Sequence, residues 1–96
     1  MKILAISKRL PTTKVESIQA LQVPEAREVW RLLGGGALRE IHFDKNRPCA
    51  ILVLEAEDIA AAEVLLASLP MVIEGQLGFD FYMMGPYRQL EHLFAG

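Results

Sequence analysis

Residues 49–55, with the sequence CAILVLE, form a near-continuous apolar run of strand length. Successive side chains of a strand point to opposite faces of its sheet, so a run that is apolar throughout is typical of a central strand. Residues 2–9, KILAISKR, form a second apolar run, which predicts a strand ended by Pro11. Both faces of the sheet therefore carry apolar side chains that need cover.

The segment after the first strand has the pattern of an interrupted helix. Thr13 and Glu16 have the spacing of a capping box and predict a helix start. Residues 23–24, Val-Pro, interrupt the pattern, and a proline suits the first turn of the helix that follows. The three glycines at 34–36 come after a helical segment, so they indicate a left-handed helix C-terminus and not a phosphate-binding loop.

The rest of the chain predicts a hairpin, a helix, a strand and a short terminal helix. Residues 37–43 alternate and pair with residues 49–55 across a polar turn. Asp58 is predicted to cap the N-terminus of a helix, and Pro70 is predicted to end that helix. Alternation from residue 72 onward predicts a long fourth strand, with one face made of Leu77, Phe79, Phe81 and Met83 and the other of Gln76, Gly78, Asp80 and Tyr82. Gly85 and Pro86 then open a terminal helix with Leu90, Leu93 and Phe94 on its apolar side.

This order, βαββαβ plus a C-terminal helix, predicts an α+β ferredoxin-like sandwich over residues 1–96, as one domain. Its four-stranded antiparallel sheet has the order 4-1-3-2, with the helices on one face. Because residues 49–55 and 2–9 are apolar on both sides, the other face presents a large apolar surface in a monomer. We expect a second copy to cover it, which makes a dimeric α+β barrel.

Composition limits the classes of protein and partner. With 52% hydrophobic and 23% charged residues, the chain is expected to fold. Its longest apolar run is far shorter than the roughly 20 residues of a membrane span, and no secretory signal pattern follows the first residues. We therefore expect a cytoplasmic protein without a membrane partner. One cysteine allows neither an internal disulfide nor a cysteine-rich metal site.

Charge is unevenly distributed along the chain. Residues 1–48 carry nine basic and five acidic side chains, whereas residues 49–96 carry one basic and seven acidic ones. The basic residues are scattered singly, only Lys8 and Arg9 being adjacent, so nucleic acid is not an expected partner. The two halves are complementary and are expected to face each other, within one subunit or across a two-fold axis.

Four segments carry a resemblance to a known family. They are the helix end VWRLL at 29–33, the strand end LEA at 54–56, the acidic start of the next helix, and its close LASLPM at 66–71, in which L-x-x-L-P precedes an apolar residue. In these segments the chain resembles the muconolactone isomerase-like group of the dimeric α+β barrel superfamily. The resemblance implies the barrel fold, a homodimer and an enzyme that uses no cofactor, but it assigns no catalytic residues one by one.

Lactone isomerisation moves a proton between carbons next to a carbonyl, which requires a base, a donor to the enolate oxygen and a dry pocket. His42 is the candidate base because its pKa is readily tuned near neutrality, and Glu40 shares its strand face. Asp80 and Tyr82 share a face of the fourth strand and add a carboxylate and a hydroxyl. Polar residues on edge strands also serve simply as solvated, aggregation-resistant edges.

Arg39, Trp30 and Tyr87 are the candidate substrate-binding residues. An arginine can hold a substrate carboxylate in a bidentate grip, although many arginines only form surface ion pairs. Trp30 and Met83 match the apolar spacing of their segments and are also expected in the core. The two histidines, His42 and His92, are too few and too far apart in sequence to predict a zinc site.

Two function hypotheses from different classes follow. The first is a small cofactor-independent homodimeric enzyme, possessing muconolactone isomerase-like activity on a small lactone or carboxylated molecule. The second is a non-catalytic module for small-ligand binding or assembly on the same scaffold, and a cofactor-free oxygenase is a third reading. In a 4-1-3-2 sheet, strands two and four are opposite edges, so we expect any site made of His42, Glu40, Asp80 and Tyr82 to use both subunits.

Overall fold

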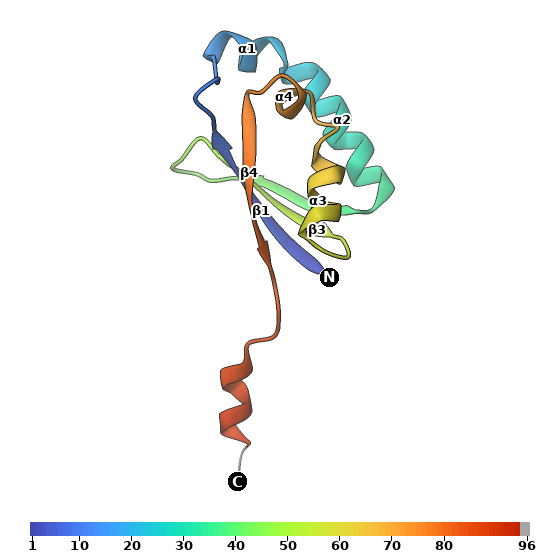
Figure 1. Ribbon diagram of the computed structural model, residues 1–96, viewed down its shortest axis with the longest axis vertical. Coiled ribbons are helices and arrows are strands. Elements are labelled where there is room, and N and C mark those ends of the chain that lie inside the picture. The colour runs from blue at the N-terminus through green and yellow to red at the C-terminus, as the bar shows by residue number, and fades with distance from the viewer. Residues whose placement is uncertain (95–96) are drawn as a thin grey trace.

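The computed structural model describes residues 1–94 and contains the predicted alternation of strands and helices (Figure 1). In chain order the elements are β1 (Lys2–Arg9), α1 (Val15–Ala20), α2 (Gln22–Gly35), β2 (Leu38–Phe43), β3 (Ala50–Glu55), α3 (Ile59–Leu66), α4 (Pro70–Ile73), β4 (Leu77–Met83) and the 3₁₀ helix η1 (Arg88–Leu93). The α+β ferredoxin-like class is thereby confirmed.

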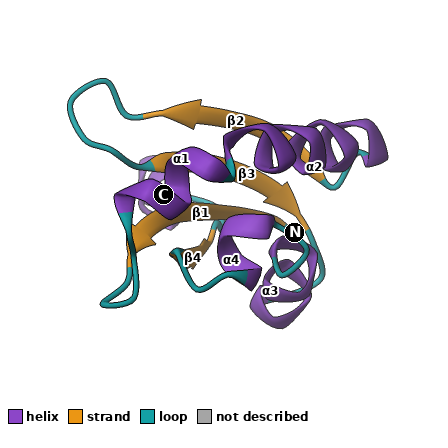
Figure 2. Cartoon of the chain, turned by 90° about the horizontal axis from the view of Figure 1, so that it is seen from above, coloured by secondary structure: helices purple, strands orange, loops and turns teal. Residues whose placement is uncertain are grey.

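The four strands form one antiparallel sheet in the order β2-β3-β1-β4. This is the predicted order, with β2 and β4 at the two edges. Figure 2 shows β3 and β1 in the middle of the sheet, with α2 running along the side of β2 and β3. The central position of β1 and β3 explains why these two strands carry the most continuous apolar sequences.

Strand register divides the sheet residues into two faces. On β1, Ile3 and Ala5 are fully buried and pair with Leu54 and Leu52 of β3. With α2, α3 and the segment before α4 they form the core, which is made of Ile3, Ala5, Leu32, Leu38, Leu52, Leu54, Ala62, Leu66 and Leu69. We call the face that carries this core the helix face and the opposite face the helix-free face. Helices α2, α3 and α4 pack against the same side of the sheet, as predicted.

The helix-free face has an apolar centre. In register, Leu4 of β1 lies beside Val53 of β3, and Ile6 lies beside Ile51. These four side chains are only partly exposed even in a single chain. Helices α2, α3 and α4 pack on the opposite face, so this apolar centre agrees with the expected apolar second face of the sheet.

The predicted capping box at Thr13 and Glu16 is wrong. Helix α1 begins at Val15 after Lys14, and no side chain caps it. The Thr13 hydroxyl instead accepts a hydrogen bond from the Leu10 N–H at 2.8 Å and donates to the Gln76 carbonyl at 2.7 Å. A tertiary contact between the end of β1 and the start of β4 thus replaces the local cap.

Three other helix signals behave as predicted. The helix is broken at Leu21, which lies between α1 and α2, and Pro24 falls in the first turn of α2. Gly36 ends α2 in the left-handed conformation with φ of 87°, which a residue with a Cβ rarely adopts. The Asp58 carboxylate caps α3 by accepting from the Ala61 N–H at 2.8 Å.

Pro70 does more than end a helix. Helix α3 already ends at Leu66, and Pro70 is the first residue of the short α4, where its missing N–H is no loss. Residues 70–73 are therefore helical, and the fourth strand begins at Leu77, later than predicted. Its two faces alternate as expected, because Phe79 and Phe81 pair with Ser7 and Ala5 on the helix face.

The chain after β4 extends away from the body as an arm, defined here as residues 84–94 (Figure 1). The arm makes the molecule long, with extents of 59 × 28 × 22 Å. The terminal helix is present as η1, but its expected apolar side is exposed and does not pack on the body. In the part of the chain described here, no helix has the length and apolar character that a membrane span needs.

Candidate functional site

A cavity of about 630 Å³ lies between helices α1 and α2 and the helix face of the sheet. Pockets for small organic molecules commonly have volumes of about 300–1,000 Å³. Most of its wall is apolar, because the sheet and both helices turn apolar side chains towards each other; these are Ile18, Ala26, Val29, Leu33, Ile41, Ala50, Met71 and Leu77. A ligand inside would contact this apolar wall and would stay open to water on the side of the rim.

Two polar residues of β1 reach this wall. Ser7 and Arg9 are two residues apart on the strand and thus share the helix face. Ser7 is buried, and its Oγ accepts a hydrogen bond from the Ala50 N–H at 2.7 Å. A hydroxyl that accepts in this way retains its own proton for donation. Arg9 is exposed and has no ion-pair partner among residues 1–94, so its guanidinium is free to meet an anion.

Glu25 is the carboxylate of the cavity wall. It lies in the first turn of α2, and its Oε1 accepts a hydrogen bond from the Met71 N–H at 2.9 Å. Burial raises the pKa of Glu25, and the nearby charge of Glu28 adds to this, although the bond from Met71 opposes it. The result is a carboxylate that binds a proton more readily than an exposed glutamate does.

Sequence reasoning missed Glu25, Ser7 and Arg9. An acidic residue after Pro24 reads as an ordinary favourable charge at a helix N-terminus, so Glu25 carries no local sign of a site. Ser7 does carry one signal: it follows Ile3 and Ala5 at the period of a strand, so a hydroxyl falls on the buried face. Only the tertiary placement of α2, which packs on β2 and α4, brings these side chains to one cavity.

The first pair of predicted catalytic residues lies on β2. The His42 Nε2 and the Glu40 Oε1 are 3.2 Å apart, and both side chains are mostly exposed. In register, Glu40 lies beside Val53 and His42 beside Ile51, so the pair belongs to the helix-free face. His42 also contributes to the rim of the cavity.

The second predicted pair lies on β4, at the other edge of the sheet. Asp80 and Tyr82 lie beside Ile6 and Leu4, which places them on the helix-free face. The Asp80 carboxylate accepts a hydrogen bond from the Lys8 ammonium group at 2.7 Å. Three strand spacings, about 14 Å, separate the β2 and β4 edges, so the structure does not bring the two pairs together within one chain.

The three predicted substrate-binding residues lie in different places. Trp30 lines the cavity, but it is 77% exposed, so the expectation that it belongs to the core is wrong. Met83, at 43% exposed, is likewise not a core residue. Arg39 lies where the pairing of β2 with β3 is irregular. The hydrogen bond from the N-terminal ammonium group is the main cause that lowers the pKa of Glu55, and the charge of Arg39 adds to it. Tyr87 lies on the arm, away from the cavity of its own chain.

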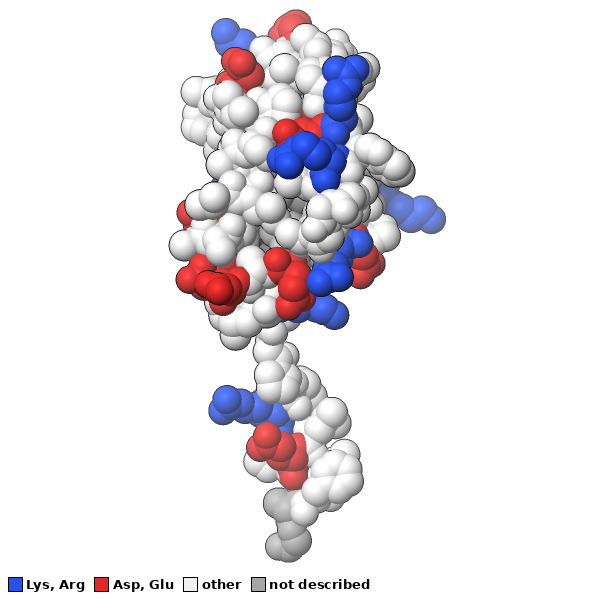
Figure 3. Space-filling view, turned by 90° about the vertical axis from the view of Figure 1, so that its right-hand side faces the viewer, with Lys and Arg blue, Asp and Glu red and all other residues white. Residues whose placement is uncertain are grey.

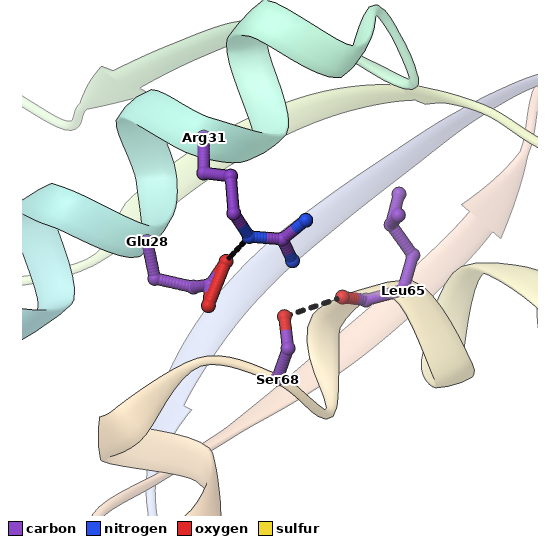
Figure 4. A network of polar contacts seen from close by, with 4 residues as sticks. All are labelled: Glu28, Arg31, Leu65 and Ser68. Atoms are coloured by element: carbon purple, nitrogen blue, oxygen red, sulfur yellow. Dashed lines mark hydrogen bonds and ion pairs between the residues drawn. The ribbon is translucent and has the colours of Figure 1, made fainter.

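The remaining charged side chains form ion pairs away from the cavity or are scattered over the surface. Figure 4 shows the ion pair of Glu28 and Arg31 on α2, opposite the Ser68 hydroxyl that donates to the Leu65 carbonyl at the end of α3. On the side of the molecule seen in Figure 3, basic and acidic side chains are intermixed over the body. Within residues 1–94, no group of three or more His, Cys, Asp or Glu side chains is placed to hold a metal ion.

Comparison with known proteins supports the fold. No family model and no curated protein matches the sequence. Among solved structures, the chain is similar to a 5-chloro-2-hydroxyhydroquinone dehydrochlorinase from Burkholderia phenoliruptrix, solved in complex with 2,5-dihydroxybenzoquinone. The TM-score is 0.68 at 12% identity over 93% of this chain and 98% of the other. It is also similar to muconolactone isomerase, with a TM-score of 0.65 at 18% identity over 91% and 93% of the two chains. The predicted resemblance in fold is thus confirmed.

Proposed function

We propose that this protein is a small cofactor-independent enzyme that transfers a proton on a small lactone or carboxylated, aromatic-derived molecule bound in the cavity of the helix face. The observation that carries the proposal is a half-buried carboxylate, Glu25, in the wall of a largely apolar cavity. The two structural neighbours are, by name, an isomerase of a lactone and a dehydrochlorinase of a hydroxylated aromatic ring, and both share this fold.

The residues of the cavity wall match the needs of this reaction. The Glu25 carboxylate takes a proton from a carbon next to the substrate carbonyl, and the electron pair of that C–H bond forms the enolate. The Ser7 hydroxyl donates to the enolate oxygen, where negative charge develops. Glu25 then returns the proton to another carbon of the conjugated system, so the double bond moves and no oxidant is needed. Arg9 binds a substrate carboxylate at the cavity entrance.

The proposal includes a homodimer. The helix-free face has the apolar centre of Leu4, Ile6, Ile51 and Val53, and a second copy packed on it would close a dimeric barrel. In that arrangement His42 and Glu40 of one chain approach Asp80 and Tyr82 of its partner, as the sequence predicts. Those four residues are therefore the second candidate set, and the same experiment tests them.

Deuterium exchange into muconolactone distinguishes these sites. In D₂O, the wild-type protein should catalyse the incorporation of deuterium into the lactone next to its carbonyl, which proton NMR measures. The Glu25→Gln variant should slow this exchange by about 10²-fold or more. Ser7→Ala should slow it as well, because the enolate oxygen loses its donor. Glu16→Gln, which removes an exposed carboxylate from α1, is the matched control.

Each contrary result has a separate meaning. If His42→Ala abolishes exchange and Glu25→Gln does not, the reaction takes place on the helix-free face. If wild-type protein binds the lactone, detected as a thermal shift, but exchanges no proton, the chain is a binding module. If it neither binds nor exchanges, this substrate class is wrong.

A further inference from the structure

The arm, residues 84–94, is unsupported by its own chain. Its last described hydrogen bond to the body joins the Met84 N–H to the Lys2 carbonyl at 2.9 Å. Beyond it, the bonds are internal to the arm: the Leu90 N–H donates to the Tyr87 carbonyl, and the Phe94 N–H to that of Glu91. An isolated helix of six residues is far too short to be stable in water by itself. The arm therefore needs a surface to fold against.

The side chains of the arm indicate that this surface is apolar. Beyond Met84, its large apolar residues are 54–85% exposed and fall within eight positions: Tyr87, Leu90, Leu93 and Phe94. Soluble proteins rarely leave such a cluster uncovered unless it is an interaction site. The arm also carries Arg88 and Glu91, one charge of each sign, so it offers no net charge for a charged partner.

The cavity rim presents a matching surface. Trp30 of α2 and Phe43 at the end of β2 both line the cavity, and they are 77% and 81% exposed. Among residues 1–83, these two are the most exposed aromatic side chains, and both lie beside the apolar cavity. Aromatic rings bury about 150–250 Å² each, so covering these two would stabilise a contact strongly.

The path of the chain favours the rim of a second copy over its own. The arm leaves the body beside Lys2, at one end of β1, whereas Ser7 and Arg9 line the cavity near the other end. Seven residues of strand, about 23 Å, separate the two ends. In Figure 1 the arm continues away from α1 and α2, the helices that cover the cavity. The arm thus extends away from the cavity of its own chain.

We propose that the arm of one copy closes the cavity of a second copy, with Tyr87, Leu90, Leu93 and Phe94 packed on Trp30 and Phe43. This inference rests on the proposed function, because it concerns the same cavity. It identifies the partner as a second copy of this chain, whose arm covers the cavity and completes the site. In a two-fold pair the exchange is reciprocal. Two such contacts bury on the order of 1,000 Å², the lower bound of a specific interface.

Trp30 reports this contact directly, because it is the only tryptophan of the chain. In wild-type protein at micromolar concentration, we expect Trp30 emission at short wavelength and protection from acrylamide. Leu90→Asp with Phe94→Asp should move the emission to longer wavelength and increase quenching several-fold. Val64→Asp replaces an equally exposed apolar residue on α3 and is the matched control, with no expected change. Unchanged emission in the arm variant would overturn the proposal.

Cross-linking identifies the chain to which the covering arm belongs. In a Cys49→Ser background, one protein carries Gln89→Cys on the arm and a second, with a size tag, carries Arg27→Cys on α2. After mixing and subunit exchange, a short bismaleimide should link the two proteins, whereas Gln89→Cys with Val64→Cys should not be linked. A link that forms only within a doubly substituted chain would show that the arm folds back on its own cavity. Neither readout uses catalysis, so both remain decisive if proton exchange fails.

Discussion

Glu25 shows how one side chain joins fold to chemistry. Its position is set by the first turn of α2, and its carboxylate accepts from the Met71 N–H at the start of α4. Burial next to the apolar cavity raises its pKa, and this makes it the strongest base candidate of the helix face. The same burial costs stability when the group is ionised, since a charged carboxylate is held away from water.

A pH dependence of stability follows from that pKa. The folded-state pKa of Glu25 lies above its ordinary value of 4.5, so the folded state binds the proton more tightly than the unfolded state. Wild-type protein should therefore lose stability relative to Glu25→Gln as the pH rises from 4.5 through the folded pKa. Urea unfolding of both proteins at several pH values measures this difference, with Glu16→Gln as control. A difference that stays constant with pH would show that burial does not perturb Glu25.

Local capping signals in this chain succeed where nothing competes with them. At Asp58, the residues that follow form α3 directly, and the carboxylate accepts from the Ala61 N–H. At Thr13, the Gln76 carbonyl offers a tertiary partner, and the hydroxyl bonds there instead. The Gln76 side chain strengthens this link, because its Oε1 accepts from the Lys14 N–H at 2.6 Å.

The cap of α3 makes a measurable contribution to stability. Asp58→Ala should lower the free energy of unfolding by about 0.5–2 kcal/mol, because an N–H of the first turn loses its acceptor. Asp58→Asn keeps a side-chain oxygen at that position and should lose much less. Chemical denaturation followed by circular dichroism provides both values. Equal losses in the two variants would mean that charge and not the hydrogen bond stabilises this helix end.

At the scale of the whole molecule, the two faces of the sheet have different partners. The helix face is covered by α2, α3 and α4 within the chain, and Leu52 of β3 is 1% exposed there. The next residue, Val53, lies on the helix-free face between Leu4 and Glu40. Of these two adjacent residues, Leu52 therefore contributes to the core of one chain, whereas Val53 lies on the face that we propose forms the dimer interface.

Aspartate substitutions distinguish the two faces. Leu52→Asp should unfold the protein, because it places an unpaired charge in the core. Val53→Asp should keep the helical circular dichroism signal but weaken dimerisation at least about tenfold, the equivalent of about 1.4 kcal/mol. Size-exclusion chromatography with light scattering over a dilution series measures the dimer, and Val64→Asp on α3 is the control. A wild-type monomer at micromolar concentration would contradict the barrel.

The element types and their order follow from the sequence, because hydrophobic period, glycines and prolines act over a few residues. The sheet order β2-β3-β1-β4 follows from matching that element order to the ferredoxin-like sandwich, and the resemblance of short segments to the muconolactone isomerase-like group implies the same fold. The cavity is not predictable in this way, because Ser7, Glu25 and Met71 come to line one wall only when α2 packs on β2 and α4. Tertiary structure also decided that Trp30 lines the rim of the cavity and not the core. Helical spacing predicts the side of the helix on which a residue lies, but it does not predict which element packs on that side.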